Sequence, residues 1–376
     1  MFRKQNPPLD DCTEVLEDES KSILLGIIAQ LGKGMDLHRV TLPTFVLEPR
    51  SMLERITDFM SHPDLLLQAS IQLDPVDRFL GVVQYFLSGW HIKPKGVKKP
   101  YNPILGEHFK CQWDYPGGAT KSRGYYLAEQ VSHHPPRSAY YYANPECGIY
   151  IQGELCPRAK FLGNSAATLM EVGKMVLELG DKCKVHCPTS DLICELDFKT
   201  KGFFSGQFNS VTGKIKQVTN QKVLYDITGQ WTGQIYIIPF GKEEKTLFFD
   251  AATATPLPCK HMIPIPDQDP MESRRLWGPV TRAILSNDLD QATHHKTILE
   301  EKQRQRAKER VGEWQPRYFS QRGDGSFEFN LHASIDPNNP SDAEIKLIST
   351  LFTKDQQSPV VVVTPVLSPV PVTHLV

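Results

Sequence analysis

Two adjacent histidines, His133 and His134, are the most distinctive candidates for chemistry in this sequence. They lie in the stretch EQVSHHPP, whose prolines fix φ and remove backbone donors, so a strand that carries them must end there or reach a sheet edge. Because imidazole titrates near neutral pH, a phosphate group with about −1.5 to −2 charges would recruit both rings as donors. The stretch therefore predicts an anion site at a strand end.

Two further clusters supply donors of a similar kind. The stretch KKPYNP leaves Lys99 and Asn102 as donors on a turn that proline constrains. Much later, Lys296, Glu300 and Arg304 are spaced i, i+4, i+8 on one face of a predicted helix, where the glutamate would hold the two cations in register. Taken singly, either cluster is also typical of a solvated surface.

Helices are predicted on both sides of the sequence that carries the histidines. Leu24, Ile27, Ile28 and Leu31 follow the spacing of one apolar helical face, and glycines end that helix. Other helices are predicted at residues 51–60, 74–88, 272–285 and 288–311. The last of these carries the second donor cluster.

The middle of the chain changes to short strands separated by Gly, Pro and Asn. Strands are predicted at residues 125–131, 138–142, 148–155, 174–179, 192–198, 206–211, 222–228, 234–238 and 246–250. Short strands with turn signals about every ten residues favour a barrel or a sandwich over a parallel sheet. A barrel of more than about eight strands leaves room inside for a ligand.

Composition narrows the class of protein. The 376 residues, 40% of them hydrophobic, suffice for one large domain or two ordinary ones, and the net charge of −1 argues against a nucleic-acid partner. The eight cysteines fit no spaced disulfide framework, and no secretory signal is recognisable. No apolar run approaches the roughly 20 residues that span a bilayer. We expect a soluble protein of the reducing cytoplasm.

Longer blocks of sequence carry a family resemblance. EQVSHHPP matches the signature of the oxysterol-binding protein family, and LPTFVLEPRSMLERITDFM, GWHIKPKGVKKPYNPILGEHF, FLGNS, DFKTKGFFSG, ESRRLWGPVT and EEKQRQRAKER resemble other blocks of that family in its order. The resemblance covers about Glu19 to about His332. The block LPTFVLEPRSMLERIT most resembles the branch that moves phosphatidylserine.

The resemblance implies a mainly β fold with flanking helices (α+β). A lipid-binding domain at 19–335 would consist of an N-terminal lid helix at about 19–45, an incomplete antiparallel β-barrel enclosing a lipid tunnel at about 100–250, and a C-terminal helical subdomain at about 270–312. Residues 1–18 would be a flexible segment, and residues 336–376 a low-complexity tail.

The implied activity is lipid transfer without catalysis. Such a protein extracts phosphatidylinositol 4-phosphate from one membrane and exchanges it for a second lipid, here phosphatidylserine first and a sterol next. The resemblance assigns the 4-phosphate to His133, His134 and Lys99, and makes Asn102 a further head-group donor. We expect no enzyme activity and no cofactor or metal.

The remaining family positions lie on the charged helix and near the N-terminus. Lys296, Glu300 and Arg304 match positions that serve the inositol ring and phosphates, and Leu47 matches a tunnel position near bound serine lipid. The helix with Leu24 would be the lid. We expect a monomer that touches membranes transiently, at contacts between the endoplasmic reticulum and the plasma membrane or at other contacts.

Two features depart from the family pattern. Ala159 stands where the phosphatidylserine carriers have a serine, which weakens the assignment of the second lipid. Between Met170 and Lys174 roughly two strands of typical length are absent. Deleting barrel strands would expose unpaired edges, so we favour an incomplete splice or gene-model product as the origin of this shortened segment.

Three other functions compete with lipid exchange. The histidines could bind zinc, with Cys183, His186 and Cys187 as a second cluster, although neither HExxH nor paired CxxC spacing is present. The stretch GNSAA around Ser165 resembles a hydrolase nucleophile elbow but lacks its second glycine. A phosphoinositide or sterol sensor that does not transfer its lipid would need the same pocket as a carrier.

Overall fold

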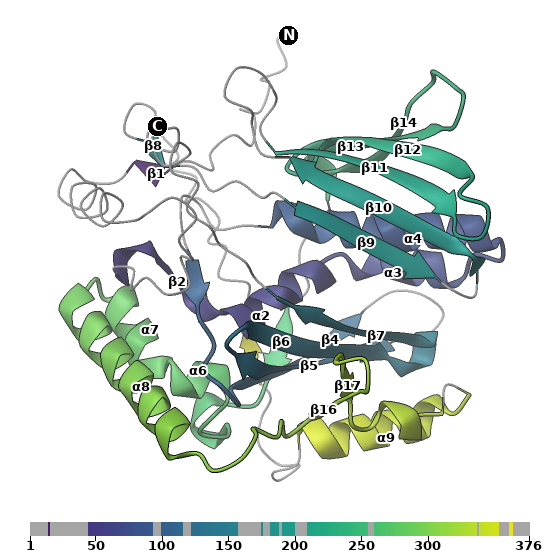
Figure 1. The fold of residues 1–376 in the computed structure, drawn as a ribbon. Coiled ribbons are helices and arrows are strands. Elements are labelled where there is room, and N and C mark those ends of the chain that lie inside the picture. Colours follow the sequence, from purple (N-terminus) through teal and green to yellow (C-terminus); the bar gives the residue numbers. More distant parts are fainter. Residues whose placement is uncertain are drawn as a thin grey trace, which may run out of the picture. The chain divides into compact units, whose positions relative to one another are not determined.

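The chain forms two compact units, each built from segments that are separate in the sequence. A computed structural model describes residues 14–15, 44–92, 99–115, 122–156, 174–175, 181–187, 190–199, 209–254, 259–336, 338–352 and 361–363 (Figure 1). Unit 1 comprises Met1–Glu48, Ile56–Lys99 and Arg158–Thr255, and unit 2 comprises Pro49–Arg55, Pro100–Pro157 and Pro256–Val376. The chain passes from one unit to the other within strand β2 (Leu47–Ser51) and within strand β3 (Lys99–Tyr101).

Unit 1 contains a six-stranded antiparallel sheet in which every strand pairs with its neighbour in the sequence. The strands are β9 (Asp181–Cys187), β10 (Leu192–Lys199), β11 (Ser210–Gln217), β12 (Val223–Gln230), β13 (Gln234–Pro239) and β14 (Thr246–Asp250). Each strand therefore pairs with the strand that precedes or follows it in the sequence, so the sheet is a meander of neighbouring strands.

Apolar and charged residues occupy opposite faces of this sheet. Along β10, Leu196 and Phe198 are buried, and they pack against Phe79 and Val83 of helix α4 (Pro75–Ser88). On the other face, Glu195 pairs with lysines of the neighbouring strands β9 and β11. The period-two pattern thus decides which side the helix covers.

Two helices of unit 1 form a hairpin. Helix α3 (Pro63–Ser70) precedes α4, and a Cβ atom on Gly81 would lie 2.6 Å from Cβ of Ala69, so glycine permits the close approach of the two helices. The side chain of Asp74 caps α4 by accepting the N–H groups of Val76 and Asp77. The predicted helix at 74–88 is confirmed, whereas α3 was not predicted.

Unit 2 contains the second six-stranded antiparallel sheet, in the order β18-β15-β4-β5-β6-β7. Its strands are β4 (His108–Tyr115), β5 (Ser122–His133), β6 (Pro136–Asn144), β7 (Ile149–Leu155), β15 (Lys260–Met262) and β18 (Val361–Val363). Strand β5 ends at the paired histidines, as the sequence predicts.

The C-terminal part of the chain covers one face of the unit 2 sheet. Tyr125, Leu127 and Tyr141 pack against a layer formed by the hairpin of β16 (Phe319–Gln321) and β17 (Phe327–Phe329) and by helix α9 (Pro340–Leu351). The prediction of a low-complexity tail from residue 336 is therefore wrong for α9. The apolar residues Ala343, Leu347 and Leu351 recur at helical spacing and are fully buried. The Pro, Asn and Ser residues around the start of α9 made this pattern hard to recognise in the sequence.

The other predicted helices of unit 2 are present with shifted ends. They are α6 (Ser273–Leu276), α7 (Gly278–Leu285) and α8 (Leu289–Glu309). The predicted helix at 51–60 is a single α-turn, α2 (Met52–Arg55), followed by the 3-10 turn η3 (Ile56–Met60) in unit 1. None of the helices that the structure describes combines the length and the apolar character needed to cross a bilayer.

Smaller elements complete the described chain. They are β1 (Glu14–Val15), which pairs with β8 (Lys174–Met175), and the 3-10 turns η2 (Thr44–Val46), η4 (Gly89–His91), η5 (Pro145–Cys147), η8 (Ala251–Thr253), η9 (Ile265–Asp267) and η10 (His332–Ser334). The predicted lid residues at 24–31 lie outside the described residues.

A mainly β fold with flanking helices is confirmed. The sequence did not predict β4 or β9, because charged residues such as Lys110 interrupt the apolar pattern of these strands. The strands that the structure describes form two six-stranded sheets, one in each unit, and three two-stranded sheets, instead of one continuous barrel. A barrel that encloses a lipid tunnel, and the domain boundaries, stay predictions.

Candidate functional site

The paired histidines form the tip of the hairpin between β5 and β6. His133 pairs with Pro136 and Ser132 with Arg137, and a bulge after Gln130 shifts the register just before the tip. The His134–Pro135 peptide bond is cis. His133 is half-buried, and His134 is exposed.

The two imidazoles contact each other instead of splaying apart. Nδ1 of His133 lies 3.2 Å from Nε2 of His134, and the rings meet edge to face. Nδ2 of Asn102 lies 3.5 Å from Nε2 of His133. Since an amide N–H₂ can only donate, His133 accepts at Nε2, donates from Nδ1 to His134, and so leaves the N–H at Nδ1 of His134 available. The chain of contacts ends in a donor suited to an anion.

A turn after Asn102 connects this hairpin to helix α8. The N–H of Gly106 donates to the carbonyl of Gln130 at 3.0 Å, and the N–H of Leu105 donates to Oε1 of Gln303 at 3.1 Å. Gly106 has φ of +80°, and a Cβ there would lie 2.7 Å from Trp314, so glycine is required on both counts. The Asn102 turn therefore brings the first donor cluster to the histidines and to α8.

A buried carboxylate, Glu107, fixes the same turn from inside. It accepts hydrogen bonds from the hydroxyls of Ser51 and Ser273 at 2.5 and 2.7 Å, from Nε1 of Trp277 at 2.9 Å and from the N–H of Ile104 at 3.0 Å. Burial raises the pKa of Glu107, although the four donors oppose that shift. Sequence reasoning missed this residue; the only signal was an acid inside the apolar stretch PILGEHF.

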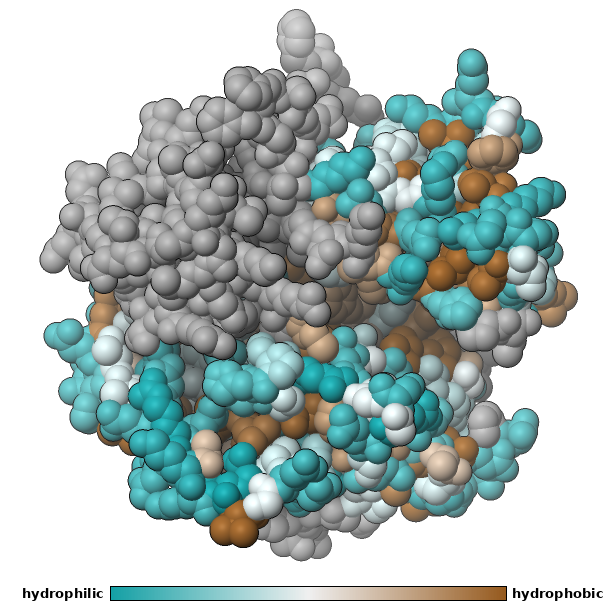
Figure 2. All heavy atoms as spheres, in the orientation of Figure 1, coloured by the Kyte–Doolittle hydropathy of each residue, from teal (hydrophilic) through white to brown (hydrophobic). Residues whose placement is uncertain are grey.

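The charged face of α8 has the predicted arrangement. Nζ of Lys296 lies 2.7 Å from Glu300, and the guanidinium of Arg304 lies 3.6 Å from the same carboxylate. The Lys296 side chain is only 14% exposed, whereas that of Arg304 is 62% exposed. Figure 2 shows a largely hydrophilic surface over α8, so this face offers polar groups to a ligand.

Six of the predicted positions thus lie in connected segments of unit 2, namely Asn102, His133, His134, Lys296, Glu300 and Arg304. Asn102 contacts His133, His133 contacts His134, and Gln303, on the same turn of α8 as Arg304 and Glu300, binds the Asn102 turn. Lys99 is half-buried and belongs to unit 1, as does buried Leu47. The lipid-binding roles of all these residues stay predictions.

The structure places the three residues of the alternative zinc cluster on two opposite faces of one strand. On β9, Cys183 and Cys187 face the apolar core of unit 1, and His186 lies between them on the opposite face. Within the described ranges, no three His, Cys, Asp or Glu side chains are grouped so that they could hold an ion. Ser165 lies outside the described residues.

Comparisons with known proteins identify the family. A family model described as oxysterol-binding protein matches residues 26–172, 166–282 and 270–334, and the chain belongs to the oxysterol-binding protein family. The first two matched segments meet at 166–172, beside the predicted shortened segment at Met170.

Several curated relatives are similar over most of this chain. An oxysterol-binding protein homologue of Schizosaccharomyces pombe is 42% identical over 89% of this chain and 77% of its own length. Oxysterol-binding protein homolog 7 of Saccharomyces cerevisiae is 43% identical over 77% of this chain and 73% of its own. Human oxysterol-binding protein-related protein 5 is 39% identical, and the match spans 81% of this chain but 38% of the human protein.

Solved structures show the same fold. The Osh1 ORD domain in complex with ergosterol aligns with a TM-score of 0.62 at 21% identity, over 91% of this chain and 93% of that domain. The Osh3 ORD of Saccharomyces cerevisiae in complex with PI(4)P aligns with a TM-score of 0.56 at 19% identity, over 91% and 94%. At these identities the likeness concerns the fold alone.

Proposed function

We propose that this protein binds phosphatidylinositol 4-phosphate at the histidine hairpin and exchanges it for a second lipid between membranes. The observation that carries the proposal is the chain of contacts from Asn102 through His133 to His134, next to a turn bound by α8. Family membership and the PI(4)P complex of the similarly folded Osh3 domain support it.

The chemistry of the site suits a phosphomonoester on an inositol ring. A phosphate near His134 gains its N–H donor and favours protonation of the imidazole pair, because an adjacent anion stabilises the charged form. Each charge-assisted hydrogen bond contributes about 1.5–3 kcal/mol, so a few such bonds separate this lipid from neutral lipids by several powers of ten. The resemblance adds Lys99 as a further cation.

Helix α8 adds selectivity for the sugar. Lys296 and Arg304 provide positive charge, while Glu300 between them accepts hydrogen bonds, which are the contacts that inositol hydroxyls can donate. A purely cationic face would bind any anionic lipid. The acid among the cations therefore favours a phosphorylated polyol.

Phosphatidylserine is our first choice for the second lipid, on the resemblance of LPTFVLEPRSMLERIT. A sterol is the alternative, favoured by the ergosterol and cholesterol complexes of the Osh1 ORD domain. Those structures are 20–21% identical to this chain, whereas the relatives named above are 39–43% identical. Ala159 in place of serine counts against phosphatidylserine.

Transport of this kind requires no bond to be broken. Acyl chains exchange one hydrocarbon environment for another, whereas each methylene exposed to water would cost about 0.8 kcal/mol, so a lid must cover the chains in transit. The apolar face of Leu24, Ile27, Ile28 and Leu31 is suited to that role and to touching a membrane. We thus assign no catalysis and no cofactor, and expect a monomer working between cytoplasmic membrane surfaces. A sensor that keeps its lipid is the alternative.

Extraction of phosphatidylinositol 4-phosphate from liposomes tests the proposal. Replacing both His133 and His134 with Ala should abolish extraction while leaving the thermal unfolding midpoint within a few degrees of wild type, because both residues lie at a hairpin tip. The matched control replaces His294 and His295, an adjacent pair on α8, with Ala. Unchanged extraction by the His133/His134 variant, or equal loss in the control, would reject the site.

A further inference from the structure

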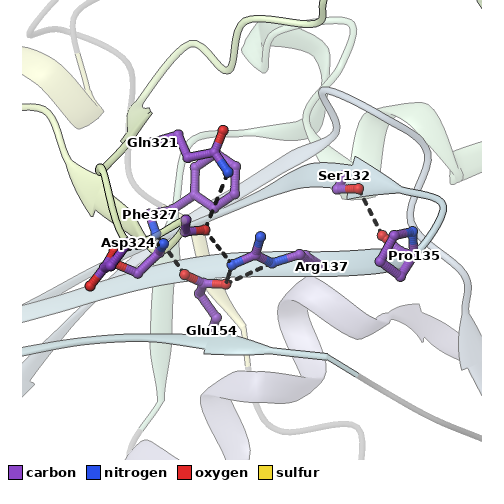
Figure 3. Close-up of polar contacts among 9 residues, drawn as sticks. Ser132, Pro135, Arg137, Glu154, Gln321, Asp324 and Phe327 are labelled. Atoms are coloured by element: carbon purple, nitrogen blue, oxygen red, sulfur yellow. Dashed lines mark hydrogen bonds and ion pairs between the residues drawn. The ribbon is translucent and has the colours of Figure 1, made fainter.

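A second polar cluster lies at the base of the histidine hairpin. Arg137, the first residue after the two prolines, donates from Nε and a terminal nitrogen to the carboxylate of Glu154 on β7, the former at 2.9 Å (Figure 3). Its guanidinium also donates to the carbonyl of Gly325 at 2.9 Å and lies 4.9 Å from the centre of the Phe327 ring. One cation thus binds a neighbouring strand and the β16–β17 hairpin together.

Glu154 completes the link to that hairpin. Its other oxygen accepts the N–H of Phe327 at 2.6 Å, so the carboxylate bridges Arg137 and the backbone of β17. The hairpin turn is itself ordered, because Asp324 accepts the N–H of Ser326 at 2.9 Å and the Gln321 amide donates to the Gly325 carbonyl at 3.3 Å. We call Arg137, Glu154 and the turn around Gly325 the clasp. It joins strands β6 and β7 to a turn that has its own internal hydrogen bonds.

The clasp lies close to the histidines in the sequence and in the strand register. Arg137 pairs with Ser132, and the next pair in register is Pro136 with His133. Ser132 adds an internal brace, since its hydroxyl donates to the Pro135 carbonyl at 2.7 Å (Figure 3). Any shift of β6 at Arg137 would therefore move the tip that carries both imidazoles.

A second carboxylate ties strand β5 to the same C-terminal segment. Glu129, at the start of EQVSHHPP, accepts the backbone N–H groups of Arg317 and Tyr318 at 2.8 and 2.9 Å. Burial raises the pKa of Glu129, and these two donors oppose that shift. The strands that lead to and from the histidine tip are thus both anchored to residues 317–327.

We infer that Arg137 and Glu154 are positioning residues, which hold the paired histidines in the geometry that binds a phosphorylated head group. The inference rests on the proposed function. Their side chains are 24% and 15% exposed, so their charge-assisted bonds are partly shielded from water and orient the strand strongly. Head-group affinity should then depend on the contacts between the clasp and the C-terminal hairpin.

The test compares two arginines that bind carboxylates. Arg137→Met keeps the apolar stem but removes the clasp, and we expect affinity for liposomes containing phosphatidylinositol 4-phosphate to fall about tenfold. Arg322→Met is the matched control, because Arg322 binds Glu328 within the β16–β17 hairpin and does not reach the histidine hairpin. Binding of a fluorescent sterol or phosphatidylserine should be unchanged in both variants, because neither lipid carries the phosphomonoester that the imidazoles are proposed to bind.

The possible results distinguish a positioning role from a structural one. Equal affinity in wild type and Arg137→Met, or equal loss in Arg322→Met, overturns the positioning role. Loss of both lipids together marks Arg137 as merely structural. If Arg137→Met does not fold, Arg137→Lys decides, because lysine keeps the positive charge but loses the paired donation from Nε and a terminal nitrogen to Glu154; it should bind the phosphoinositide with intermediate affinity. Failure of the His133/His134 variant to lose extraction would instead reject the proposed function itself.

Discussion

The two sheets of this protein differ in what they bury. Unit 1 places charges such as Glu195 on an open face, where its partner Lys184 is also exposed, and packs apolar residues on the inner face of its sheet. Unit 2 buries the carboxylates of Glu107 and Glu129, which accept hydrogen bonds from donors in distant segments. Buried polar groups are stable only when their hydrogen-bond partners lie in fixed positions. Glu107 and Glu129 therefore fix how distant segments are arranged in unit 2, the unit that carries the candidate site.

The largest expected effect concerns a buried ion pair in unit 2. The Glu54 carboxylate binds the Arg274 guanidinium at 2.9 and 2.5 Å. Burial alone would raise the pKa of Glu54, but Arg274, assisted by Lys260, lowers it to about 2. Glu54→Gln leaves buried cations without a counter-charge and should reduce the free energy of unfolding by about 3–5 kcal/mol in urea denaturation.

The matched variant in unit 1 is Glu195→Gln. This glutamate pairs with Lys184 and Lys216 at 3.2 and 2.9 Å, but its side chain is 39% exposed. An exposed pair contributes about 0–1 kcal/mol, and this loss should shrink further in high salt. Equal losses in the two variants would contradict the contrast between the sheets.

An intermediate effect should appear in unit 1 on acidification. His62 and His91 lie with their Nε2 atoms 2.9 Å apart. Burial, and then the neighbouring His62, lower the pKa of His91 to about 4. A histidine whose pKa is lower in the folded state gives stability that is present above the unfolded value near 6.5 and lost as pH falls through 4. Wild type should therefore lose about 2 kcal/mol from this residue between pH 7 and pH 5.

The variant His91→Gln isolates that contribution. Its free energy of unfolding should fall about 2 kcal/mol less than that of wild type over the same pH interval, because the titrating group is gone. Parallel pH profiles for the two proteins would show that the imidazole is not held neutral by its surroundings.

Two helix caps, one in each unit, should also have small effects. Asp74 caps α4 in unit 1, and Asp288 caps α8 in unit 2 by accepting the N–H of Gln291. Either change to Ala should cost about 1 kcal/mol of stability in thermal unfolding. Only Asp288→Ala should also weaken binding of phosphatidylinositol 4-phosphate, since α8 carries Lys296. Loss of binding with Asp74→Ala would break the assignment of the site to unit 2.

Some elements of each unit depend on nearby residues and were predictable. In unit 1, the buried residues of β10 alternate with period two, and α4 begins at the Asp74–Pro75 signal. The tip of β5 was also predictable, because Pro135 and Pro136 act on their own neighbours. Spacing on α8 likewise predicted that Glu300 would bind both Lys296 and Arg304.

The remaining features depend on partners far apart in the sequence. Glu107 draws donors from Ser51 and Ser273, more than 50 and 150 residues away, and Arg137 reaches Gly325. No pattern of neighbouring residues in the sequence predicts such contacts. The same holds for the link between the Asn102 turn and α8, through Leu105 and Gln303, on which the grouping of the donor clusters depends.

The central claim, that the histidine hairpin recognises a phosphorylated head group, is tested most directly by comparing two lipids that differ only in the 4-phosphate. Wild-type protein is incubated with liposomes containing either phosphatidylinositol 4-phosphate or phosphatidylinositol, and the extracted lipid is quantified by mass spectrometry. We predict extraction of the phosphorylated lipid at least about a hundredfold above the other, from two or more charge-assisted bonds to the phosphate. Equal extraction of the two lipids would contradict the account.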